Sequence, residues 1–117
     1  MRVGVIAGAL LGIATMGWSA TALAVDHFVA FNLTTSTEFK GLYLAPAGTS
    51  DWGANQVLGD REKVWDSSER LKLTGISRGR FDVRVVDDKG RQCSMRGVDM
   101  TKDLTFAVRD ADLASCH

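Results

Sequence analysis

From residue 28 onward the chain alternates apolar and polar residues with a period of two, which indicates half-buried β-strands. The clearest case is the segment 80–85, in which Phe81, Val83 and Val85 alternate with arginine and aspartate. Similar alternation recurs in four other short segments: residues 29–33, 42–45, 70–74 and 104–109. Gly, Asp and Ser residues punctuate these segments. We therefore predict an all-β fold, a small antiparallel β-sandwich or a partly open barrel.

One β-hairpin is predicted in register. Asp88, Lys89 and Gly90 separate two strand patterns, and Gly at the end of a three-residue loop suits a type I turn followed by a left-handed residue. Pairing of Asp87 with Arg91 would place apolar residues opposite one another on one face and opposite charges on the other. The cross-strand partners expected are Val85 with Cys93, Val83 with Met95, Arg84 with Ser94, and Asp82 with Arg96.

The segment 60–70 has two interpretations. Its charges are compatible with a short helix that turns Val64, Trp65 and Ser68 inward, or with a short strand that ends at the turn formers Asp66 to Ser68.

Residues 1–24 have the composition of a helical secretory signal peptide that is removed. Arg2 precedes an apolar stretch, and Ala22 and Ala24 have the small-residue spacing at which signal peptidase cuts. Cleavage after Ala22 is the alternative, and a membrane anchor is the competing interpretation. We expect a single periplasmic or secreted β domain over residues 25–117, with no membrane span after cleavage.

The two cysteines predict a covalent link, and the net charge limits the classes of partner. In an oxidising compartment Cys93 and Cys116 are expected to form a disulfide, although an intermolecular bridge or a reactive thiol is the alternative. Lys and Arg number 14, as do Asp and Glu, so the formal net charge is zero. This balance disfavours nucleic acid and anionic membrane as partners.

The Gly-rich segment 46–59 allows three interpretations. It can simply turn the chain, because a proline at its start is followed by three glycines. It can offer Trp52 and Asn55 to a protein partner. Asp51, Asn55 and Asp60 supply oxygen atoms that suit a hard cation, but their spacing does not match a known calcium loop.

A second candidate metal site depends on the cleavage position. If the mature chain begins at Val25, its amine, the following backbone amides and the imidazole of His27 form a square-planar set for Cu(II) or Ni(II) around Val25, Asp26 and His27. Cleavage after Ala22 would remove this site.

The chain offers little for catalysis. Both histidines, His27 and His117, lie near the ends of the predicted domain, where no positioned imidazole is expected. Arginines gather instead on the predicted outer face of the hairpin, and Arg84 and Arg96 are candidate partner-binding residues. Aspartates interleave with them, so a solvated, charge-paired surface is the alternative.

Three stretches carry a resemblance to a known group: FNLTTSTEFKGLYLAPAGTSDWGANQVLGD, FDVRVVDDKG and GVDM. The chain resembles small exported bacterial β-domain proteins of unknown function with an LYLxPxGxxxWGxNxLG-like segment and a DVRVVDDxG hairpin. Some carry a Tat-signal or argininosuccinate lyase label. An argininosuccinate lyase is a long and mostly helical enzyme, unlike this short chain rich in strand patterns. A Tat signal contains a pair of arginines, whereas Arg2 has no arginine neighbour. The resemblance therefore implies a scaffold and no catalytic residues.

We expect a non-catalytic, cofactor-free exported binding domain whose partner is a protein or other envelope material. The alternatives are Cu(II)/Ni(II) binding at the mature N-terminus and inhibition of a cell-wall hydrolase.

Overall fold

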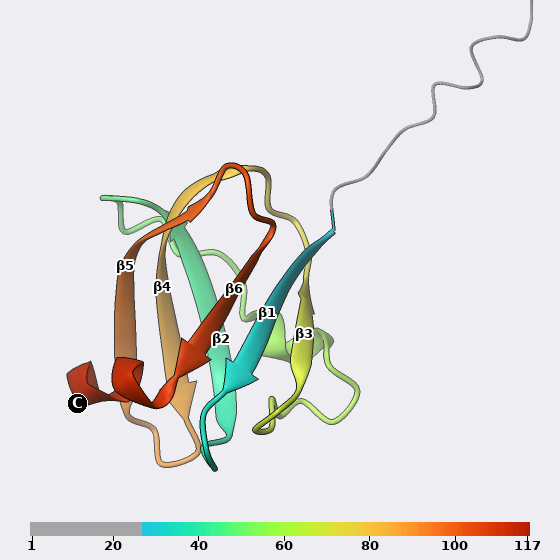
Figure 1. Cartoon of the computed structure of the whole chain (residues 1–117), viewed down its shortest axis with the longest axis vertical. Helices are drawn as coiled ribbons and strands as arrows, with labels where there is room; N and C mark the ends of the chain where they lie inside the picture. Colours follow the sequence, from blue (N-terminus) through green and yellow to red (C-terminus); the bar gives the residue numbers. More distant parts are fainter. Residues whose placement is uncertain (1–26) are drawn as a thin grey trace, which may run out of the picture.

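The computed structural model describes residues 27–117, which form six β-strands and two short 3-10 helices (Figure 1). The strands are β1 Phe28–Leu33, β2 Phe39–Pro46, β3 Arg70–Leu73, β4 Gly79–Asp87, β5 Gln92–Met100 and β6 Thr105–Arg109, and the 3-10 helices are η4 Gln56–Gly59 and η5 Asp110–Ser115. The predicted signal peptide and its cleavage sites lie outside the described residues. Among residues 27–117 no helix is long and apolar enough to cross a membrane.

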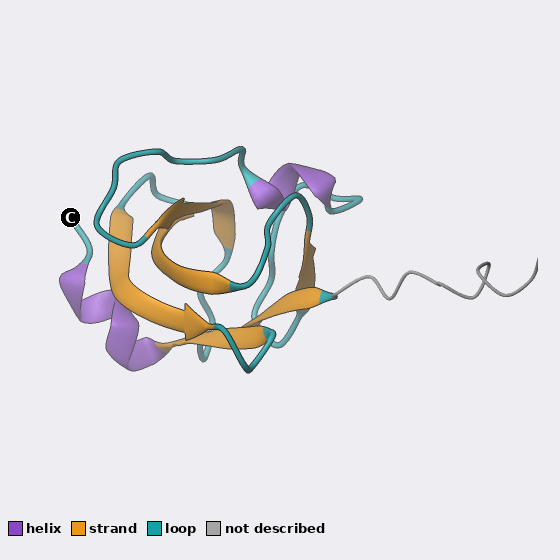
Figure 2. Ribbon diagram, turned by 90° about the horizontal axis from the view of Figure 1, so that it is seen from above, coloured by secondary structure: helices purple, strands orange, loops and turns teal. Residues whose placement is uncertain are grey.

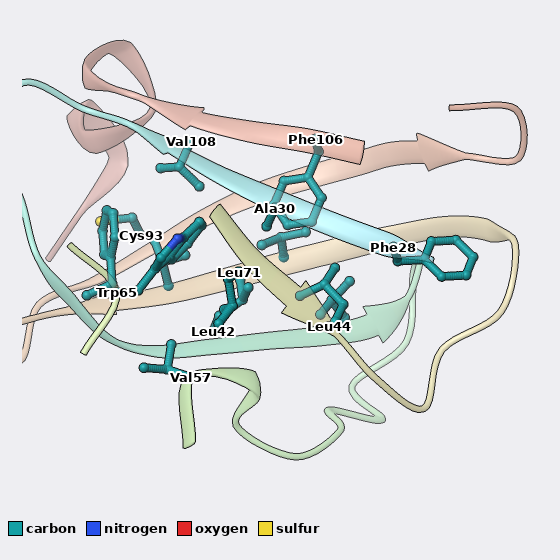
Figure 3. Close-up of a cluster of buried hydrophobic side chains, with 14 of the residues drawn as sticks. Phe28, Ala30, Leu42, Leu44, Val57, Trp65, Leu71, Cys93, Phe106 and Val108 are labelled. Atoms are coloured by element: carbon teal, nitrogen blue, oxygen red, sulfur yellow. The ribbon is translucent and has the colours of Figure 1, made fainter. Parts of the chain in front are cut away.

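The strands form two three-stranded sheets with the orders β3-β1-β6 and β2-β4-β5. Every pair is antiparallel except β1 and β6, which run parallel. Seen from above, the two sheets surround a shared core as a partly open barrel (Figure 2). Side chains from both sheets meet there, among them Leu42, Leu71 and Val108 (Figure 3). The predicted all-β class is therefore confirmed, with one parallel pair added to it.

The predicted hairpin between β4 and β5 is confirmed for the part nearest its turn. Val85 faces Cys93, Val83 faces Met95, and Gly90 has a positive φ of 83°. Farther from the turn the ladder departs from simple alternation, because Gly97 forms a β-bulge with φ 66°.

The bulge re-aims the end of β5. Asp82 lies beside both Arg96 and Gly97, and the Arg96 guanidinium is 3.5 Å from its carboxylate. The extra residue moves Val98 and Met100 to the core side of the strand, where Met100 is fully buried.

Strand β1 buries the opposite residues from those that its apolar pattern suggests. Phe28, Ala30 and Asn32 face the core, whereas Leu33 is 48% exposed. Asn32 tolerates complete burial because its amide is fully used: Nδ2 donates to the carbonyls of Thr37 and Trp65, and Oδ1 accepts from Thr34.

The segment 60–70 is not helical, and before β3 begins at Arg70 only Trp65 in it pairs as a strand residue would. Trp65 forms an isolated bridge with Phe39, with backbone hydrogen bonds of 2.9 and 3.0 Å. Its buried indole donates from Nε1 to the carbonyl of Glu69 at 3.0 Å. The chain then turns at Ser67 and Ser68 before entering β3.

The predicted disulfide between Cys93 and Cys116 is present. It joins β5 to the residues that follow η5. Next to it, Gln92 and His117 exchange two backbone hydrogen bonds of 2.9 and 3.0 Å. The C-terminal residues are therefore attached to the free edge of β5.

Candidate functional site

The candidate site lies on the outer face of the β2-β4-β5 sheet, where the loop 47–55 folds back over the strands. Its centre is formed by Tyr43, Trp52 and Arg84, which we call the Arg84 stack. Tyr43 of β2 and Arg84 of β4 are direct partners in the ladder. The loop brings Trp52 over the same guanidinium, although Arg84 lies 32 positions later in the chain.

The geometry of the stack is that of two cation–π contacts. The guanidinium carbon of Arg84 lies 4.4 Å from the centre of the Trp52 ring and 5.2 Å from that of Tyr43. All three side chains are half-buried. Contact with two rings restricts the guanidinium and reduces its access to water.

Gly41 makes room for the tyrosine of this stack. A Cβ at this position would lie 3.0 Å from a ring carbon of Tyr43 and 3.2 Å from the Cβ of Val86. Both distances are shorter than ordinary carbon contacts. A side chain at Gly41 would therefore require the Tyr43 ring or the Val86 side chain to shift by a few tenths of an ångström.

Arg84 differs from its neighbours on the hairpin in having no acidic partner. Arg91 pairs with Asp87 at 2.8 Å, Arg96 with Asp82 at 3.5 Å, and Arg80 with Asp99 at 3.8 Å. Within residues 27–117 no carboxylate pairs with Arg84, and its buried Nε has no hydrogen-bond partner. The stack thus holds a positive charge that the described chain does not neutralise.

Asp82 anchors the loop and the bulge beside the stack. Its carboxylate accepts from the backbone N–H groups of Gly48 and Gly97, each at 3.0 Å. These two hydrogen bonds lower the pKa of Asp82 against the opposing effect of burial, and the charge of Arg96 lowers it further. An ionised Asp82 therefore holds both the loop, at Gly48, and the bulge of β5, at Gly97.

The structure places the predicted partner-binding residues in different roles. Trp52 and Arg84 are in contact, and Arg96 lies on the same face, with 79% of its side chain exposed. Asn55 instead turns to the backbone: Oδ1 accepts from Leu42 and Val57, and Nδ2 donates to the carbonyl of Lys40. Its amide attaches the loop to β2.

Of the two candidate metal sites, the one in the Gly-rich segment lies within residues 27–117, whereas the N-terminal one lies there only in part. Asp51 and Asp60 do not gather with a third ligand, and residues 27–117 contain no group of three His, Cys, Asp or Glu side chains placed to hold a metal ion. His27 is exposed just before β1. Val25 and Asp26, the other members of the N-terminal set, lie outside the described residues.

The aspartates of the hairpin turn and of the segment after β6 serve turns and helix ends. Asp87 accepts from the backbone N–H groups of Lys89 and Arg91 inside the hairpin turn. Asp110 accepts two hydrogen bonds from Thr35, and Asp112 accepts from the backbone of Arg109 at the start of η5. These contacts are typical of structural carboxylates.

Sequence reasoning missed two features of this region. Tyr43 has the pattern of an ordinary outward strand residue, and only its register against β4 places it beside Arg84. The second feature is a cleft of about 390 Å³ between the edges of β2 and β3, which we call the seam cleft. It is lined by Leu44, Gly53, Ala54, Asn55, Gln56, Gly59, Lys72, Thr74, Gly75 and Ile76.

Comparisons of the chain with protein-family models, with curated proteins and with solved structures find no match.

Proposed function

We propose that the protein is a non-catalytic exported binding domain that docks a protein of the cell envelope through the Arg84 stack. The observation that carries this proposal is the unpaired charge of Arg84. The other hairpin arginines in the salt bridges above have an aspartate, whereas Arg84 has two aromatic rings and a buried Nε without a partner. A carboxylate from outside the chain would complete this arrangement.

The chemistry of the stack suits a carboxylate of a protein partner. A guanidinium offers parallel N–H donors that match a carboxylate, and rings that already hold it in place reduce the entropy lost on binding. Tryptophan, tyrosine and arginine are also the residues that contribute most to protein interfaces. The disulfide is compatible with the oxidising compartment in which such a partner would be met.

The test is an NMR titration of the full chain with acetyl-Ala-Glu-Glu-Ala-amide and its glutamine counterpart. We expect the glutamate peptide alone to shift the Trp52 indole and Arg84 Nε–H signals. Arg84→Gln should weaken binding by about tenfold, because it removes one charge-assisted interaction worth about 1.4 kcal/mol.

Arg61→Gln is the matched control, since Arg61 is an exposed arginine away from the stack. It should leave the affinity unchanged. Equal binding of the two peptides, or an equal loss in the Arg61 variant, would contradict the proposal.

A further inference from the structure

Strand β3 presents an open backbone edge. Among the strands of residues 27–117 it pairs with β1 alone, so its other side is the edge of the sheet (Figure 1). The amide of Gln56 bonds to both the N–H and the C=O of Thr74, at 3.0 and 2.9 Å. The backbone groups of Thr74 therefore point toward Gln56 and away from β1. Backbone groups alternate sides along an antiparallel strand, so those of Lys72 and Arg70 face the same way. Among the described residues nothing pairs with the N–H or C=O of Lys72.

The facing edge of β2 is covered by the chain itself. Asn55 accepts from the N–H of Leu42 and donates to the carbonyl of Lys40. The N–H of Gly53 donates to the carbonyl of Leu44 at 2.9 Å. The two edges that border the seam cleft are therefore unequal: that of β2 is capped at the N–H of Leu42 and at the carbonyls of Lys40 and Leu44, whereas among the described residues that of β3 is capped at Thr74 alone.

Hollows border β3 both at its open edge and over the outer face on which it pairs with β1. Besides the seam cleft, two hollows of about 310 and 280 Å³ share Lys72 with it. Leu44 and Ile76 give the seam cleft apolar walls. Gly59 also lines it; its φ is not left-handed, and a Cβ there would meet no atom within 4 Å. Neither backbone conformation nor packing requires glycine at this position, and the missing side chain keeps the cleft open.

The charges along this edge favour an acidic occupant. Lys72 lines all three hollows and Arg70 lines the one of about 310 Å³, and no described acidic residue lines any of them. The nearby Glu69 is engaged elsewhere, because its carboxylate accepts from the N–H of Asp66 at 3.0 Å. A second copy is a poor occupant: antiparallel pairing of two β3 strands about Leu71 would set Arg70 of each copy against Lys72 of the other.

We propose that the edge of β3 binds an acidic, extended segment of a protein partner by β-strand addition. The added strand would pair with the backbone of Lys72. Side chains on one of its faces would carry carboxylates opposite Arg70 and Lys72, while those on the other face, on the same side as Leu71 and Leu73, would enter the apolar seam cleft. The segment recognised therefore alternates acidic and apolar residues. This inference stands on its own observations and does not require the Arg84 stack to bind anything.

The experiment is an NMR titration of the full disulfide-bonded chain with acetyl-Glu-Val-Glu-Val-Glu-amide, compared with the lysine counterpart acetyl-Lys-Val-Lys-Val-Lys-amide. We expect the glutamate peptide to shift the amides of Arg70 and Lys72 and to slow hydrogen exchange at Lys72. The lysine peptide should do neither. Methylating the backbone nitrogens of one alternate set of peptide residues should abolish binding, and methylating the other set should not, because only one set faces β3.

Lys72→Glu should weaken binding by about tenfold, because it removes an attractive cross-strand pair and adds a repulsive one. Lys102→Glu is the matched control; that lysine is exposed in the turn between β5 and β6, outside all three hollows. Equal binding of the two peptides, equal effects of the two methylation patterns, or an equal loss in both variants would overturn the proposal.

Two further outcomes separate this proposal from others. Shifts confined to Trp52 and Arg84 would overturn strand addition at β3 and leave the Arg84 proposal standing. Shifts confined to residues of β3 would overturn the Arg84 proposal and leave strand addition standing. Self-association that grows with protein concentration and slows exchange at Lys72 without peptide would show a second copy as the occupant and would overturn an acidic partner.

Discussion

At the scale of single residues, amide side chains act here as substitutes for backbone. Asn55 and Gln56 are consecutive, and each is bonded to the edge of a different sheet, β2 and β3 respectively. Asn32 does the same inside the core, where it satisfies the carbonyls of Thr37 and Trp65. A polar residue can replace an apolar one in the interior when every one of its hydrogen-bonding groups is used.

Asn32 is fully buried and Gln56 is only half-buried, so removal of these two amides should have different costs. Asn32→Ala should lower the free energy of unfolding by about 2 kcal/mol, because it leaves the buried N–H of Thr34 without an acceptor and takes one donor from each of the carbonyls of Thr37 and Trp65. Gln56→Ala should cost less than about 1 kcal/mol, since its side chain is only half-buried and water can reach the backbone groups of the exposed Thr74. Urea denaturation of both variants measures the two values, and similar losses would contradict this account of Asn32.

At the scale of elements, the bulge in β5 and the loop after β2 depend on one carboxylate. Asp82 holds the N–H groups of Gly48 and Gly97, and Arg96 lies over it. Because these contacts require an ionised oxygen acceptor, the position of the loop beside the Arg84 stack is coupled to the charge of Asp82.

The coupling predicts a pH dependence of stability. The folded pKa of Asp82 is below its ordinary value of 3.8, so the folded state holds fewer protons than the unfolded state in this range. The stabilising contribution is fully present above about pH 4 and is lost as the pH falls through the folded pKa. Asp82→Asn should be less stable at pH 7 and should lose less further stability on acidification than the wild type. Thermal unfolding between pH 7 and pH 2 tests this, and parallel curves would argue against it.

At the scale of the whole molecule, a short chain builds its core from two small sheets and closes it with a covalent link. The seam between β2 and β3 is bridged by η4 and by the amides of Asn55 and Gln56, whereas the C-terminal residues are joined to β5 by Cys93–Cys116. Domains of this size bury a modest fraction of their surface, so a single cross-link contributes a large share of their net stability.

Removing the cross-link should therefore be costly. Cys93→Ser combined with Cys116→Ser should lower the free energy of unfolding by about 3 kcal/mol, because the unfolded chain regains the entropy of an open loop. Reduction of the wild type should produce a similar loss, which serves as the internal control. A double variant as stable as the oxidised wild type would show that Leu113 and the backbone pairing of His117 hold the tail without the bond.

Much of the strand layout and one pairing register could be predicted from local signals. Val83 facing Met95 and Val85 facing Cys93 follow from a glycine-ended turn and a period of two, which depend only on neighbours in the chain. The Gly-rich segment and the hairpin pattern indicate Trp52 and Arg84 as separate candidates, but neither pattern predicts that the two side chains are in contact. The bulge at Gly97 was missed because a single glycine in a strand has several meanings.

The sequence by itself determined which segments are extended, how β4 and β5 pair near their turn, and which cysteines join. Only the tertiary structure decided that β1 buries Asn32 and turns Leu33 outward, that β6 lies parallel to β1, and that the edge of β3 stays open. The physical reason is range: periodicity and turn chemistry act between residues close in the chain, whereas the choice of buried face and of strand neighbours depends on which distant segments complete the core and satisfy its hydrogen bonds.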